Sequence, residues 1–282
     1  SAAGAPNLFL TSGSAVPTFT TNSWFNTLDF TGTTSTPAAT NINVSTLVLA
    51  TGGTYTGLIP VFTRTQTWTS QFSKQLGGIG VNGSGVTLTL DNTQTYTATS
   101  ICYLTQGTLD LGGFDLTIGT FSSTNTNTRS ISFGTGNIAL ATTTAGTTVL
   151  AMDDATSFTC SGTGAFTSAM TVTRTFSFGS TTGGSAANAP NLSLTSGASI
   201  PTITSGSWFK ALDFTGTTCT PATTVVNVDT LTLATGGTYT SFTPLFTRTQ
   251  TWTPQFSKQL AGVGVSSSNT VLTLGGTQTF GP

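Results

Sequence analysis

The sequence predicts an all-β protein built as a parallel β-solenoid, a right-handed β-helix whose repeated coils form a rod. Three observations predict it: a long internal repeat, a threonine- and glycine-rich composition with few charges, and stretches of alternating polarity separated by glycine turns. The same short strands would also fit tandem antiparallel β-sandwich repeats, and this is the alternative architecture.

The repeat is long and free of gaps. Residues 1–98 recur at 185–282 with a constant offset of 184, and about two thirds of the paired positions are identical. The chain therefore divides into repeat copy 1 (1–98), the remainder of the period (99–184) and a truncated repeat copy 2 (185–282). Long modules repeated in series are typical of solenoids, arrays and fibres. Because the sequence opens and closes inside a period, we expect it to be a segment of a longer repetitive protein.

The composition favours strands and disfavours several partner classes. Threonine supplies 69 of 282 residues, charged residues make up 5%, and Glu and His do not occur. Threonine suits a pleated sheet and the good helix formers are scarce, so we expect almost no helix. A net charge of −1 gives little self-repulsion, which favours a homo-oligomer or polymer of the same chain. Scattered basic residues and short apolar runs predict no nucleic-acid partner and no membrane insertion.

The individual strands are read from period-2 patterns. In VTLTL, Val86, Leu88 and Leu90 share one face and threonines the other. In GTLDLGGFDLTIGTF, two alternating stretches flank a Gly-Gly break, and the second places Phe114 with Leu116. Gly-Gly pairs at 52, 77, 112, 183, 236 and 275 mark turns. A fainter repeat inside the period predicts coils of unequal length, at an assumed roughly 20 to 25 residues per coil.

The segment GTLDLGGFDLTIGTFSS (107–123), with its Leu-x-Leu, Gly-Gly and Leu-x-Ile rhythm, resembles coils of known right-handed parallel β-helices. These occur in phage tail-fibre and spike proteins and in bacterial surface adhesins. The Thr/Gly-rich style of the whole chain is similar to repetitive fibre proteins of aquatic phages and bacteria. The resemblance implies an extracellular, cell-surface or virion location, and it carries no catalytic motif.

Arginines and tryptophans supply the candidate contact face. Alternation in FTRTQTWT places Arg64 with Trp68, and the second copy repeats the pattern. Such arginines either bond to turn carbonyls at a coil edge or face another chain, since Arg and Trp are enriched in interfaces. The tryptophans of the two SWF triplets either stack on sugar rings or pack within a coil. The candidate interface or ligand residues are Arg64, Trp68, Arg129, Arg174, Arg248, Trp252, Trp24 and Trp208.

The acids and cysteines point to structural roles. A polysaccharide-degrading β-helix enzyme needs converging carboxylates, for which Asp29, Asp110 and Asp115 are the candidates; turn capping or a strand-end position is the simpler interpretation. Cys102, Cys160 and Cys219 are expected to be small buried hydrophobes, the alternative being an inter-chain bond or a reactive thiol. Without His, no usual zinc set is available, and we predict no cofactor or metal.

These observations predict a non-catalytic structural segment of an extracellular or virion fibre, associated with copies of itself. The alternatives are a glycan- or receptor-binding adhesin or tail-fibre module, whose partners would include cell-surface glycans, and a polysaccharide-degrading enzyme.

Overall fold

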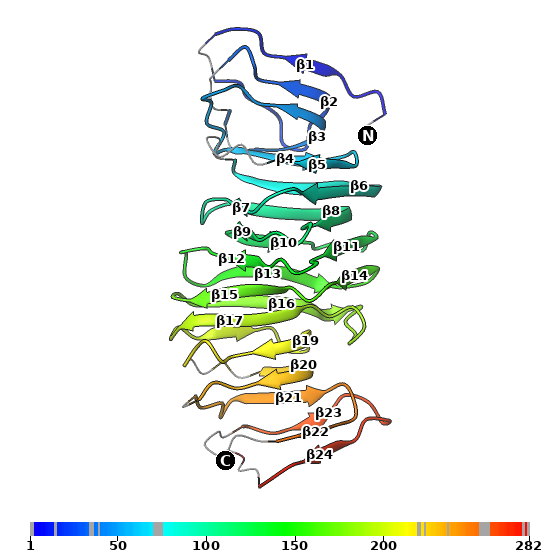
Figure 1. Ribbon diagram of the computed structural model, residues 1–282, viewed down its shortest axis with the longest axis vertical. Coiled ribbons are helices and arrows are strands. Elements are labelled where there is room, and N and C mark those ends of the chain that lie inside the picture. The colour runs from blue at the N-terminus through cyan, green and yellow to red at the C-terminus, as the bar shows by residue number, and fades with distance from the viewer. Residues whose placement is uncertain are drawn as a thin grey trace.

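The computed structural model describes residues 3–13, 16–33, 37–38, 40–69, 76–218, 221–222, 224–235, 237–253, 260–277 and 280. Their regular structure consists of 24 strands, with no helix among these residues. The strands stack as a parallel β-solenoid of about 11 turns, and the chain runs from one end of an elongated stack to the other (Figure 1). At about 4.8 Å per coil the stack rises roughly 50 Å. The predicted parallel solenoid is confirmed, whereas the antiparallel sandwich alternative is wrong.

Three sheets are formed. In spatial order the 13-stranded sheet contains β1 (Asn7–Phe9), β2 (Trp24–Asp29), β3 (Thr40–Val48), β4 (Leu58–Phe62), β6 (Gly78–Leu90), β8 (Ile101–Asp110), β10 (Thr120–Ser122), β13 (Thr147–Asp154), β16 (Arg174–Thr182) and β18 (Pro201–Ile203), with β5 (Gln66–Trp68), β11 (Arg129–Ser132) and β14 (Phe158–Ser161) beside this path. The nine-stranded sheet contains β7 (Gln94–Thr95), β9 (Leu116–Ile118), β12 (Ile138–Leu140), β15 (Ala165–Met170), β17 (Asn191–Gly197), β19 (Trp208–Asp213), β20 (Thr224–Thr232), β21 (Phe242–Phe246) and β23 (Gly264–Val265). The third sheet pairs β22 (Gln250–Trp252) with β24 (Leu272–Leu274).

The core consists of apolar columns that run along the axis, because alternating residues of each strand point inward and successive coils stack in register. The column on the 13-stranded sheet comprises Ile79, Cys102, Phe121, Leu150, Phe176 and Ile203. The column on the nine-stranded sheet comprises Leu116, Ile138, Phe166, Leu192, Leu212 and Leu231. All twelve side chains are buried. Each coil therefore covers the apolar residues of its neighbour.

Coils differ in length, as the sequence predicts. The shortest step between paired residues is 18, from Val44 to Phe62, and the longest is 29, from Phe121 to Leu150. Part of the difference lies inside paired strands, where the register shifts, as between β6 and β8 and between β13 and β16.

The two repeat copies fold with the same register. The pair Leu8 and Leu28 recurs as Leu192 and Leu212, 184 residues on. The buried tyrosines at equivalent positions, 55 and 239, both accept a hydrogen bond at Oη from the backbone five residues earlier, each at 3.0 Å. The two copies therefore share interior packing as well as sequence.

Candidate functional site

The strand tryptophans predicted for the contact face belong to the core. Trp68 is buried against Phe62, with ring centroids 5.0 Å apart, and Trp252 packs in the same way on Phe246 at 5.4 Å. Strand pairing is interrupted between β4 and β5, so the alternation does not continue across Arg64. Phe62 and Trp68 point inward while Arg64 is exposed, and the prediction that they share a face is wrong.

Arg129 lies inside the coil, with only 1% of its surface exposed. Its guanidinium donates to the carbonyl oxygens of Ser123 and Thr156 at 2.7 Å, of Asn127 at 2.9 Å and of Asp154 at 3.2 Å. These acceptors come from a turn of its own coil and from the next coil. Burial lowers the pKa of Arg129, and the nearby Asp154 carboxylate opposes that shift. Arg129 therefore ties two coils together.

Arg174 repeats this arrangement at 2% exposure. It donates to the Leu140 carbonyl and to Ser168 Oγ, both at 2.7 Å, and to the Thr142 carbonyl. Burial lowers its pKa. The alternative in which arginines bond to turn carbonyls holds for Arg129 and Arg174. Their placement on a contact face is wrong, because no surface is left to present.

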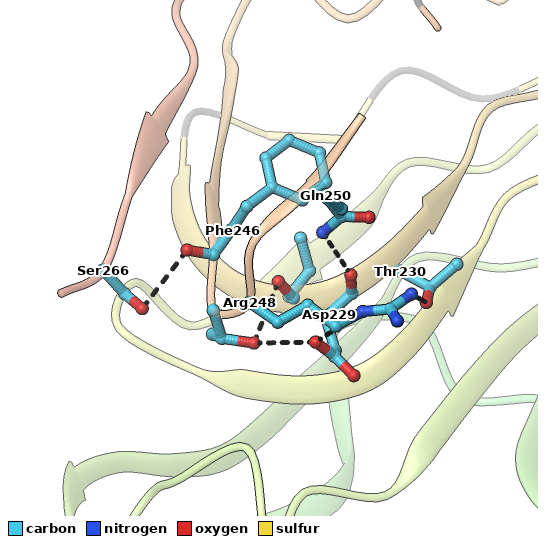
Figure 2. Close-up of polar contacts among 8 residues, drawn as sticks. Asp229, Thr230, Phe246, Arg248, Gln250 and Ser266 are labelled. Carbon is cyan, nitrogen blue, oxygen red and sulfur yellow. Dashed lines mark hydrogen bonds and ion pairs between the residues drawn. The ribbon is translucent and has the colours of Figure 1, made fainter. Parts of the chain in front are cut away.

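Arg248 is exposed and forms an ion pair with Asp229, its Nε lying 3.0 Å from Oδ1 (Figure 2). The same carboxylate oxygen accepts from the Thr247 hydroxyl at 3.3 Å, and the Asp229 carbonyl accepts from Gln250 Nε2 at 2.7 Å. The Arg248 Nη2 also reaches the Thr230 hydroxyl at 3.4 Å. This cluster joins β20 to the segment between β21 and β22 and to the first residue of β22.

Copy 1 keeps the amide bond of this cluster and lacks its ion pair. Ser45 stands at the position of Asp229, and its carbonyl accepts from Gln66 Nε2 at 3.0 Å. The Ser45 and Thr63 hydroxyls are 3.0 Å apart, but Arg64 forms no ion pair within the described residues. An exposed arginine is thus common to both copies, while its carboxylate partner belongs to copy 2.

Trp24 and Trp208 are half-buried at equivalent positions. The Trp208 ring packs on Gly184, where an added Cβ would lie 2.2 Å from Trp208 Cδ1. Packing within the stack therefore holds the Trp208 ring, and sugar stacking by either tryptophan stays a prediction.

The aspartates hold backbone groups. In four of them Oδ1 accepts from the N–H two residues on, at 2.7–3.1 Å: Asp29, Asp110, Asp154 and Asp213. The Asp115 carboxylate accepts from the Asn137 N–H at 2.8 Å, one coil away. Three strands separate β2, which carries Asp29, from β8, which carries Asp110, so these two carboxylates do not converge. The predicted capping role is found.

The two described cysteines are not paired. Cys102 belongs to the buried column, and burial raises the pKa of its thiol to about 12. Cys160 is partly buried, its Sγ lies 3.3 Å from the Ala189 carbonyl oxygen, and burial raises its pKa to about 11. Cys219 lies outside the described residues.

A groove that the sequence did not predict crosses five successive coils on the outer face of copy 1. Its volume is about 360 Å³ and it is lined by Thr21, Thr40, Asn41, Thr56, Gly57, Ile59, Gly77 and Thr99. Its floor depends on Gly77, where a Cβ would lie 2.7 Å from the Thr56 carbonyl oxygen and 3.2 Å from Ile59 Cγ1. The sequence signal that could have found it is the change of surface residues between the copies, such as Asn41 to Val225.

Comparisons with known proteins give no relative: no family model, curated protein or solved structure matches the chain. The described part of the chain contains no helix with the length and apolarity that a membrane span requires. Within that part, no three metal-binding side chains gather around a common point.

Proposed function

We propose that the chain is a structural segment that lengthens and stiffens an extracellular or virion-borne fibre. The observation that carries the proposal is the uninterrupted stack of parallel coils, in which two copies of one sequence adopt the same register. In such a stack every coil pairs with the next, so length is added without a new fold. Near-neutral, hydroxyl-rich sides favour close approach of neighbouring chains.

Equivalent residues of the two copies show what a covering coil does. Val81 in β6 is 1% exposed because β8 lies against it, whereas its counterpart Val265 in β23 is 40% exposed. Leu90 and its counterpart Leu274 differ in the same way. A further coil therefore buries apolar side chains of the coil before it, and this burial stabilises the stack.

Negative-stain electron microscopy tests the proposal, with light scattering of the same samples over a concentration series. We expect rods one coil wide that lengthen as concentration rises, or bundles made of several such rods. Compact particles that scatter as monomers at every concentration would contradict self-association and the fibre role with it.

A further inference from the structure

The groove on copy 1 has the chemistry of a binding site for an uncharged, hydroxyl-rich ligand. No charged side chain lines it, so it offers no counter-charge to a phosphate, a sulfate or a cation. Its lining contains four threonines, an asparagine and one apolar side chain, Ile59. Hydroxyl groups both donate and accept hydrogen bonds, and they suit a ligand whose own groups do the same. About 360 Å³ falls within the range of small-molecule sites.

The polar groups of the groove are held in position by the coil stack. Asn41 Nδ2 donates to Asn22 Oδ1 on the preceding coil at 2.9 Å, which fixes the amide. Among the described residues no donor reaches Asn41 Oδ1, so this oxygen remains an acceptor for a ligand. The hydroxyls of Thr21 and Thr40 lie 3.2 Å apart on adjacent coils. The lining spans five coils and therefore roughly 19 Å along the axis.

The equivalent surface of copy 2 keeps side-chain hydroxyls but lacks an amide at the position of Asn41 and an apolar side chain at the position of Ile59. Asn41 pairs with Ile59, and their counterparts Val225 and Thr243 pair in the same register. Val225 is an exposed apolar residue, and Ala261 occupies the position of Gly77. By contrast, the buried Ile42 and Val44 recur as the buried Val226 and Val228. The groove is thus a surface feature of copy 1 that the fold itself does not require.

We propose that this groove binds a neutral oligosaccharide along the axis of the stack. The exposed hydroxyls of Thr21, Thr56 and Thr99 exchange hydrogen bonds with sugar hydroxyls. Asn41 Oδ1 accepts a further one, and Ile59 contacts the apolar C–H face of a ring. The site lies on the side of the coils, so it does not depend on end-to-end extension of the stack.

Isothermal titration calorimetry and saturation-transfer NMR test the proposal, with cellohexaose, maltohexaose and chitohexaose as probes and a hexagalacturonate as the anionic comparison. The test variant is Asn41→Val, which installs the residue that copy 2 carries at the same register. The matched control is Val225→Asn, the reverse exchange on copy 2. If Asn41→Val does not fold, Thr56→Val, at an exposed position, replaces it.

We expect at least one neutral hexasaccharide to bind the unmodified chain at millimolar concentration, in preference to the anionic probe. Asn41→Val should weaken that binding tenfold or more, and Val225→Asn should leave it unchanged. Failure of all three neutral probes to bind, or equal binding by folded Asn41→Val, would overturn the proposal.

Discussion

Replacing Arg129 by methionine tests how far buried arginines hold the stack together. Met keeps most of the apolar stem and removes every donor. The carbonyls of Ser123, Asn127, Asp154 and Thr156 each lose a charge-assisted hydrogen bond of 2.7–3.2 Å. At about 1 kcal/mol or more for each lost bond, the free energy of unfolding should fall by about 3–5 kcal/mol.

The matched control is Arg248→Met, which removes an exposed ion pair and should cost about 1 kcal/mol or less. Urea unfolding gives the total effect, and amide hydrogen exchange locates it, because the loss should appear first in residues 120–160. The contrary result is that the two variants lose similar amounts of unfolding free energy, within about 0.5 kcal/mol of each other, with no local change in hydrogen exchange. That result would show that Arg129 does not couple two coils.

Two further predictions concern close packing and buried thiols. Gly162 and Gly146 both have a positive φ, +93° and +75° respectively. A Cβ added to Gly162 would lie 2.5 Å from the backbone nitrogen of Gly134 on the preceding coil, whereas a Cβ added to Gly146 would meet no atom within 4 Å. Gly146→Ala should therefore cost about 1–2 kcal/mol in urea unfolding, and Gly162→Ala about 2–5 kcal/mol; equal costs would show that the coils are not in such close contact. Burial raises the pKa of the Cys102 thiol from 9.0 to about 12 in the folded chain. The folded state is therefore favoured while the thiol stays protonated, below pH 9, and this contribution to the free energy of unfolding is lost as the pH rises towards 12. Cys102→Ala should flatten the loss of stability over that window, and rapid labelling of Cys102 in the folded chain, followed by peptide mass spectrometry, would contradict its burial.

Much of the fold could be predicted because its signals are local. Val86, Leu88 and Leu90 alternate with threonines, and all three are buried, as expected of a half-buried strand. The same rule fails where the chain turns. Phe114 follows the period of Leu116 but is exposed, because it lies in the turn after the Gly-Gly break. A period-2 pattern gives the face of a side chain only while the strand continues.

The candidate site was harder to predict because it depends on which coils are neighbours. The acceptors of Arg129 include a carbonyl 27 residues further along, and only the coil length places it there. The groove could not be predicted for the same reason. From the sequence Gly77 is expected to be a turn residue, and only the structure places Thr56 and Ile59 beside it. Coil lengths of 18 to 29 residues vary too much for these neighbours to be assigned from sequence.

The inter-coil hydrogen bonds run along the long axis of the stack, and this determines how the segment responds to tension. A pull on the two ends loads one layer of hydrogen bonds against the next, so the weakest layer opens first. An opened coil releases 18 to 29 residues, which extend to roughly 60–100 Å at 3.3–3.6 Å per residue. Loss of a single coil can thus more than double the end-to-end length of a stack that rises roughly 50 Å. We therefore expect the segment to resist extension at low force and to become highly extensible once a layer yields.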